Sequence, residues 1–176
     1  MLAFRSADSR YPFFWEDATQ PAARWHGAGE GPVQYLADTS HGAWAEFLRH
    51  EEITDPADLA GISRSIWVIE IGEPDLDVPD VPTRTLRGGR ASYAACQAEA
   101  RRLRGQGSTA ISAPTAALAP RGARGQRVGN GLHDGPALDG VTVALFGRRP
   151  DLTGWLVVAD GRPAVELLDR VRHFVR

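Results

Sequence analysis

Three side chains of complementary chemistry, Arg24, Tyr35 and Glu46, follow one another at equal intervals of eleven residues. A guanidinium binds phosphate through paired hydrogen bonds, and an aromatic ring offers a platform for a flat base. A carboxylate stabilises the positive charge that develops on a ribose when its glycosidic bond breaks. The spacing therefore predicts a site that acts on a dinucleotide.

The segments around these residues predict how they are positioned. A short strand is expected over 33–37, followed by a polar cap and a helix over about 40–50. On that helix Trp44 and Leu48 share an apolar face, whereas Glu46 lies roughly 200° around the axis from Trp44. The carboxylate is therefore expected to face a cleft rather than the core.

The remaining segments predict a mixture of strands and helices. Further strands are expected over 65–71, 109–113, 141–146 and 155–159, and further helices over 56–61, 91–104 and 163–173. Residues 5–31 are predicted to be mostly irregular, and 121–139, with five glycines and no periodicity, to be a mobile loop. Because strands and helices do not alternate regularly, the sequence predicts an α+β fold with a mixed, largely antiparallel sheet and flanking helices. The 176 residues are expected to form a single domain, 1–176.

Composition narrows the classes of function. All 20 basic residues are arginine, which excludes lysine nucleophiles and Schiff bases, and the formal net charge of −2 disfavours extended binding to nucleic acid. The sequence has no run of 18 apolar residues, so no membrane span is predicted. Cys96 is the single cysteine and has no partner for an internal disulfide. We therefore expect a cytoplasmic protein without a membrane partner.

The spaced residues also resemble a known family, the RES-domain proteins, which are the toxins of RES-Xre toxin-antitoxin pairs. The resemblance rests on Arg24, Tyr35 and Glu46, on an early Arg5, and on the segment 107–116, which is similar to the family's Gly-Ile-x-x-Pro-Ser-Ala segment. Thr115 stands where the family has serine, and it keeps the hydroxyl. Ala23 and His26 replace the glycine and asparagine that usually flank the Arg-Trp pair.

The resemblance implies a fold similar to that of ADP-ribosyltransferases and an enzyme that degrades NAD. Without a Gly-x-Gly-x-x-Gly turn or a P-loop, NAD is expected as a substrate rather than a bound carrier, with inorganic phosphate or water attacking the ribose. The implied partner is an Xre-type antitoxin that covers the pocket entrance. Contact with nucleic acid is expected only through that antitoxin, and assembly into a homo-oligomer stays open.

Each candidate residue has an expected role in cleaving the bond between nicotinamide and ribose. Glu46 stabilises the sugar cation and orients the nucleophile, while Arg24 and Arg5 bind phosphate. Tyr35 stacks on nicotinamide or gives its hydroxyl to Arg24. Thr115 meets the ribose or organises Glu46.

Two alternative functions stay open. The same site in a transferase would pass ADP-ribose to a protein or nucleic-acid acceptor. Alternatively, the departures at positions 23, 26 and 115 mark a catalytically inactive binding domain. A metal site is not expected, because His26, His41 and His133 have no further ligands at metal-binding spacing.

Overall fold

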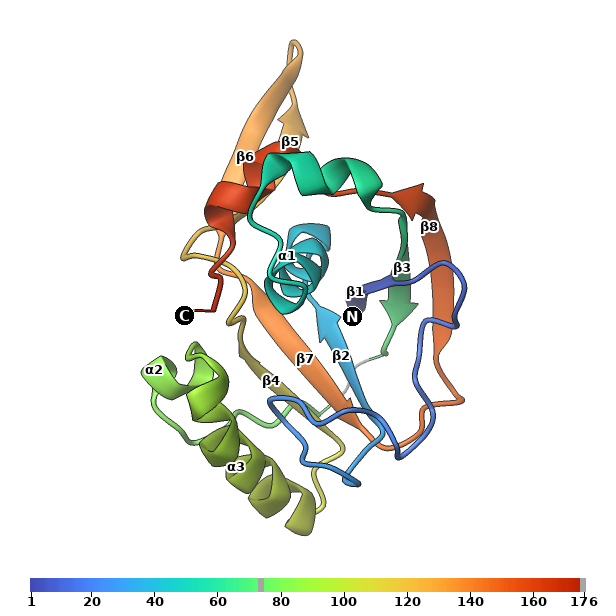
Figure 1. Cartoon of the computed structure of the whole chain (residues 1–176), viewed down its shortest axis with the longest axis vertical. Coiled ribbons are helices and arrows are strands. Elements are labelled where there is room, and N and C mark those ends of the chain that lie inside the picture. The colour runs from blue at the N-terminus through green and yellow to red at the C-terminus, as the bar shows by residue number, and fades with distance from the viewer. Residues whose placement is uncertain (73–74, 175–176) are drawn as a thin grey trace.

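The computed structural model describes residues 1–72 and 75–174 and contains one large antiparallel sheet. Its six strands lie in the order β4-β7-β2-β1-β3-β8, and each neighbouring pair is antiparallel (Figure 1). The strands are β1 (Leu2–Ala7), β2 (Val33–Ala37), β3 (Arg64–Glu70), β4 (Ala110–Pro114), β7 (Val141–Phe146) and β8 (Thr153–Gly161). The α+β prediction with a largely antiparallel sheet is confirmed.

Within residues 1–72 and 75–174, three α-helices and three short 3₁₀-helices flank the sheet. They are α1 (Ser40–His50), α2 (Thr83–Leu86), α3 (Tyr93–Gly105), η1 (Pro56–Gly61), η2 (Arg90–Ser92) and η3 (Val165–Arg170). Helix α3 packs beside β4, where Cys96, Ala100 and Leu103 share an apolar cluster with Ile111 (Figure 1). Among the described residues, no helix combines the length and apolar character that crossing a membrane requires.

Helix α1 matters most for the site because it carries Glu46. Thr39 caps it by accepting a hydrogen bond from the backbone N–H of Gly42 at 3.1 Å. Ala45 and Leu48 are fully buried in a cluster with residues of η1 and η3. This cluster fixes the rotation of α1, and Glu46 is left on a different side of the helix, as the sequence predicts.

Strand β1 was not expected, because residues from 5 onward were predicted to be irregular. It lies between β2 and β3 and pairs with β3 from Leu2↔Glu70 to Ala7↔Ser65. Its sequence, LAFRSA, mixes small, polar and aromatic residues and lacks the apolar alternation that predicts a strand. Pairing on both edges supplies the stability that its own pattern does not suggest.

Two predictions in the last third of the chain are wrong. The segment 121–139 is a hairpin of β5 (Ala123–Val128) and β6 (Leu132–Leu138) that projects from the body of the molecule (Figure 1). Both of its strands are mostly exposed, so neither needs an alternating pattern. The helix expected over 163–173 is reduced to η3, after which Val171 forms an extended bridge with Leu118.

Candidate functional site

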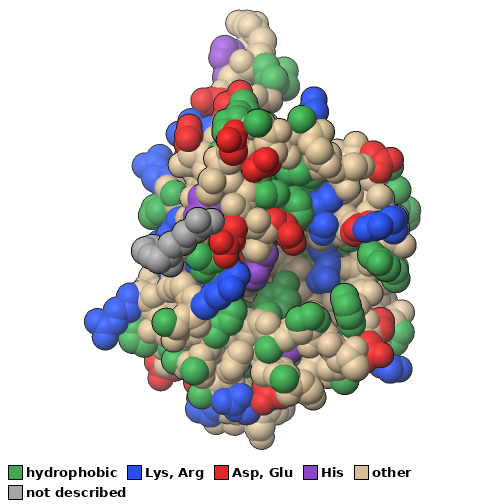
Figure 2. Space-filling view, viewed as in Figure 1, with side chains coloured by type: hydrophobic (Ala, Val, Ile, Leu, Met, Phe, Trp, Pro, Cys, Tyr) green, Lys and Arg blue, Asp and Glu red, His purple; other side chains and the backbone are tan. Residues whose placement is uncertain are grey.

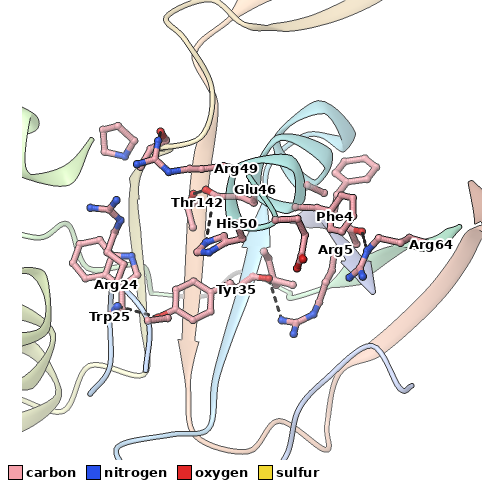
Figure 3. A pocket seen from close by; sticks show the side chains of 18 of the residues that line it. Phe4, Arg5, Arg24, Trp25, Tyr35, Glu46, Arg49, His50, Arg64 and Thr142 are labelled. Carbon is pink, nitrogen blue, oxygen red and sulfur yellow. Dashed lines mark hydrogen bonds and ion pairs between the residues drawn. The ribbon is translucent and has the colours of Figure 1, made fainter. Parts of the chain in front are cut away.

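A pocket of about 280 Å³ opens between α1 and the strands β1 and β2. Figure 2 shows a hollow near the middle of one face, with basic, acidic and histidine side chains around it. Arg5, Arg24, Tyr35 and Glu46, which lie far apart in the sequence, all line this pocket (Figure 3). The structure therefore brings four of the five candidate residues to one place, and the fifth, Thr115, contacts Glu46 directly.

Two threonine hydroxyls hold the Glu46 carboxylate. Thr115 donates to its Oε1 at 3.0 Å from the end of β4, and Thr142 donates to the same oxygen at 3.1 Å from β7. Thr115 also accepts the backbone N–H of Ala117 at 3.1 Å, which leaves its own proton for Glu46. Of the two roles expected for Thr115, the geometry supports the one that organises Glu46.

His50 lies beside the second oxygen of this carboxylate. Its Nε2 is 3.8 Å from Oε2 of Glu46, one helical turn away on α1. The Glu46 side chain is 28 % exposed and lines the pocket, while its Oε1 is held by the threonines. Sequence reasoning missed His50 and Thr142, although the i, i+4 spacing on a helix could have revealed His50.

Arg24 is buried and held in a fixed orientation. Its Nη1 donates to the carbonyl of Thr85 at 3.2 Å and to the hydroxyl of Ser92 at 3.0 Å, and its Nη2 donates to the carbonyl of Gly88 at 2.7 Å. The guanidinium carbon lies 4.9 Å from the ring centre of Tyr93. These contacts use part of its donor capacity, and its positive charge stays at the pocket wall.

Arg49, one turn after Glu46, forms a second cation beside Arg24. Its Nη2 donates to the same Gly88 carbonyl at 3.0 Å, and its Nη1 donates to the carbonyls of Ala116 and Arg172. Burial is the main cause that lowers its pKa, and the charge of Glu46 opposes this shift. Two guanidinium groups thus converge on one carbonyl oxygen, an arrangement that favours an anion nearby.

Arg5 and Arg64 form another cationic pair on the other side of Glu46 (Figure 3). Arg5 donates from Nη1 to the carbonyl of Tyr35 at 3.1 Å, and Arg64 donates from Nε to the hydroxyl of Ser6 at 2.9 Å. Burial, followed by the neighbouring charge of Arg64, lowers the pKa of Arg5 to about 10, so Arg5 keeps its charge at neutral pH.

The pocket is therefore lined by four arginines against two carboxylates, Glu46 and Glu51. Within residues 1–72 and 75–174, none of the four guanidinium groups lies within 4.0 Å of a carboxylate oxygen. Sequence reasoning did not identify Arg49 and Arg64, which had no motif around them. The excess of unpaired positive charge favours a ligand with several negative charges.

The hydroxyl of Tyr35 binds Trp25 and His26 rather than Arg24. It accepts the backbone N–H of Trp25 at 2.9 Å and lies 2.9 Å from Nδ1 of His26. His26 must donate from Nε2 to the carbonyl of Pro21, 3.0 Å away, and burial lowers its pKa. The neutral ring therefore accepts the Tyr35 proton at Nδ1. The hydroxyl does not go to Arg24, and that prediction is wrong; stacking by the ring stays a prediction.

The fold and the pocket together define an α+β protein with an arginine-lined pocket built around a carboxylate. A sequence model of the RES domain matches residues 3–165, and the chain belongs to this family. It is also similar in structure to a chain of the MbcT-MbcA toxin-antitoxin complex of M.tuberculosis, with a TM-score of 0.58 and 15% identity over 90% of this chain and 84% of that one. No curated protein sequence matches the chain.

Proposed function

We propose that this chain is the toxin of a toxin-antitoxin pair and that it degrades NAD by cleaving the bond between nicotinamide and ribose. Membership of the RES family and the structural similarity to a chain of a toxin-antitoxin complex support the first part. The observation that carries the second part is the Glu46 carboxylate, fixed by two threonine hydroxyls between two pairs of arginines.

In the proposed reaction the C–N bond between the ribose C1′ and the nicotinamide nitrogen breaks. Its electron pair stays with nicotinamide, which leaves as a neutral base, and C1′ gains the character of an oxocarbenium ion. The negative charge of Glu46 stabilises this cation, and its Oε2 accepts a hydrogen bond from a ribose hydroxyl. Because Thr115 and Thr142 hold the other oxygen, the carboxylate does not have to reorganise during the reaction.

An oxygen nucleophile then completes the reaction by forming a new bond to C1′. Water gives ADP-ribose and a released proton, whereas inorganic phosphate gives the 1-phosphate ester of ADP-ribose. The arginine pairs on the two sides of Glu46 bind the diphosphate of NAD and, in phosphorolysis, the attacking phosphate. Because arginines outnumber carboxylates in the pocket, a phosphate anion would bind there well, which favours phosphorolysis over hydrolysis.

A protein partner would restrain this activity. An Xre-type antitoxin would cover the entrance of the pocket, so that NAD in the cytoplasm cannot enter it. Free toxin would deplete a cofactor that many reactions share, and growth would stop.

The test is nicotinamide release from NAD by the purified chain, with and without inorganic phosphate. The wild type is compared with Glu46→Gln, which keeps the size of the side chain and removes its charge. The matched control is Glu166→Gln, an exposed glutamate on η3 outside the pocket. We expect Glu46→Gln to lower turnover by about a hundredfold or more, as loss of a transition-state charge contact does.

Further outcomes of this assay distinguish phosphorolysis, hydrolysis, transfer of ADP-ribose and binding without turnover. Dependence of turnover on phosphate identifies phosphorolysis, and turnover without phosphate identifies hydrolysis. Labelling of a macromolecule by radiolabelled NAD would instead identify a transferase. Binding of NAD without release of nicotinamide would show that the pocket is an inactive binding site, and release by Glu46→Gln at the wild-type rate would contradict the site assignment.

A further inference from the structure

A second basic pocket lies next to the first. It has a volume of about 510 Å³ and lies between the C-terminal end of α1, the segment after α2 and the C-terminal segment of the chain. Figure 1 shows the chain after η3, up to residue 174, close to α2. The pocket is lined by Arg49, Arg87, Arg90, Arg172, His173 and Phe174, with Glu52 as the acidic residue among its described lining residues.

The two pockets share a wall. Arg49 lines both of them, and the Gly88 carbonyl that accepts from Arg49 also accepts from Arg24 in the first pocket. At the rim, the ring of His50 from the first pocket meets the ring of Phe174 from the second, with centres 6.0 Å apart. A ligand that extends out of the first pocket past His50 would therefore meet the second pocket beside Phe174.

Arg87 and Arg90 are the side chains best placed to bind an anion there. Arg87 makes a 3.5 Å ion pair with Asp139, and its Nε has no hydrogen-bond partner among the described residues. Arg90 is largely exposed, with a side-chain accessibility of 66 %, and it forms a 3.2 Å ion pair with Glu52. Both guanidinium groups retain donors that a phosphate can accept.

The pocket also contains flat groups of the kind that stack on a base. The Phe174 ring lies 4.7 Å from the Arg90 guanidinium carbon and 4.3 Å from that of Arg49. Planar guanidinium groups and aromatic rings stack on nucleobases. A phosphate-binding cation beside a stacking surface fits a nucleoside monophosphate better than a bare phosphate.

We infer that this second pocket binds the adenylate half of the dinucleotide whose nicotinamide half lies in the first pocket. This inference rests on the proposed function. The first pocket, at about 280 Å³, is at the lower end of the volumes that hold a single small ligand, so a whole dinucleotide needs further space. The second pocket adjoins it and carries the positive charge that the adenylate phosphate requires.

The test measures binding of adenosine monophosphate to the full chain by calorimetry, which does not depend on turnover. Wild type is compared with Arg87→Ala and with Arg90→Ala, whose exposed position makes a folding defect less of a concern. The matched control is Arg84→Ala, an exposed arginine on α2 that does not line either pocket. Nicotinamide mononucleotide and inorganic phosphate are titrated into the same proteins.

We expect adenosine monophosphate to bind the wild type and Arg84→Ala equally, and the other two variants about tenfold more weakly, as loss of a charged phosphate contact does. Binding of nicotinamide mononucleotide should stay unchanged in all four proteins. The Michaelis constant for NAD should rise in Arg87→Ala and Arg90→Ala, with little change in kcat.

Several results would overturn the inference. They are no binding of adenosine monophosphate to the wild type, equal binding to all four proteins, or parallel weakening of nicotinamide mononucleotide. Inorganic phosphate that binds as tightly as the nucleotide and is weakened equally by Arg87→Ala and Arg90→Ala would also overturn it. Failure of the proposed function gives a different result: the wild type releases no nicotinamide from NAD, whatever adenosine monophosphate does.

Discussion

The hydroxyl of Thr115 can reach Glu46 because the absence of a side chain at Gly140 leaves space for the Thr115 methyl group. That methyl group points toward Gly140, where an added Cβ would lie 2.8 Å from Cγ2 of Thr115 and 3.0 Å from Cδ1 of Leu118. Gly140 is therefore matched to threonine at position 115. A serine there, as in the family pattern, would need less space.

This match predicts a rescue experiment. Gly140→Ala forces Thr115 away from Glu46, and we expect kcat for nicotinamide release to fall by about tenfold, because a displaced catalytic group loses its orientation. Adding Thr115→Ser removes the methyl group that clashes and should restore most of the activity, whereas Thr115→Ser alone should be nearly neutral. Steady-state rates of the four proteins test this, and a double variant as slow as Gly140→Ala would contradict it.

Helix α1, which carries Glu46, approaches β2 closely at its first turn. A Cβ at Gly42 would lie 2.9 Å from the Cβ of Ala37, closer than real side chains approach. Alanine is the better helix former by about 1 kcal/mol, but overpacking costs about 1–3 kcal/mol. The steric term therefore decides the outcome.

We expect Gly42→Ala to lower the free energy of unfolding by up to about 2 kcal/mol, from the difference between these two terms. Urea denaturation followed by circular dichroism measures the change. Gly61→Ala at the end of η1 is the matched control, because no atom lies within 4 Å of its added Cβ. Stability of Gly42→Ala at or above that of the wild type would show that α1 tolerates the extra atom.

The accuracy of the sequence predictions follows from burial. Helices α1 and α3 each bury an apolar face, strand β7 is buried along most of its length, and their apolar residues predicted these elements correctly. The hairpin β5–β6 exposes most of its residues, and β1 depends on its neighbours, so their patterns carried little information. Local sequence thus predicts α1, α3 and β7, which pack on the core, and misses β1 and the β5–β6 hairpin, whose own patterns are weak.

The candidate site divides in a similar way. Arg5, Arg24, Tyr35 and Glu46 could be predicted because their types and spacing form a pattern. Arg49 and Arg64 could not, because their importance comes from lining one pocket with no carboxylate oxygen of a described residue within 4.0 Å, which only the folded chain shows. The use of the Tyr35 hydroxyl also depended on a turn that brings Trp25 and His26 back to β2.

Three histidines in separate parts of the molecule have their pKa lowered by the fold. His26 lies beside β2, His41 at the start of α1, and His173 in the C-terminal segment. Burial is the first cause that lowers the pKa of each of them. Nearby arginines add to the effect, while for His26 the Pro21 carbonyl and the charge of Glu30 oppose it.

A lowered pKa in the folded state means that the unfolded chain takes up protons first as the pH falls. The unfolded pKa of histidine is about 6.5, so stability is fully present above that value and is lost as the pH falls from about 6.5 toward the folded values. The carboxylates with lowered pKa, such as Glu99 and Asp151, lose their contribution at lower pH, below their unfolded values near 4. Asp38 has the opposite sign, because burial raises its pKa.

We therefore expect the free energy of unfolding to decrease between pH 7 and pH 5, in urea titrations at constant ionic strength. The variant His26→Asn separates one histidine from the other groups, because asparagine does not titrate and its amide oxygen can still accept the Tyr35 hydroxyl. Its stability should fall less steeply than that of the wild type over this interval, whatever its absolute stability. Equal slopes for wild type and His26→Asn would mean that the folded protein accepts the proton on His26 as readily as the unfolded chain does.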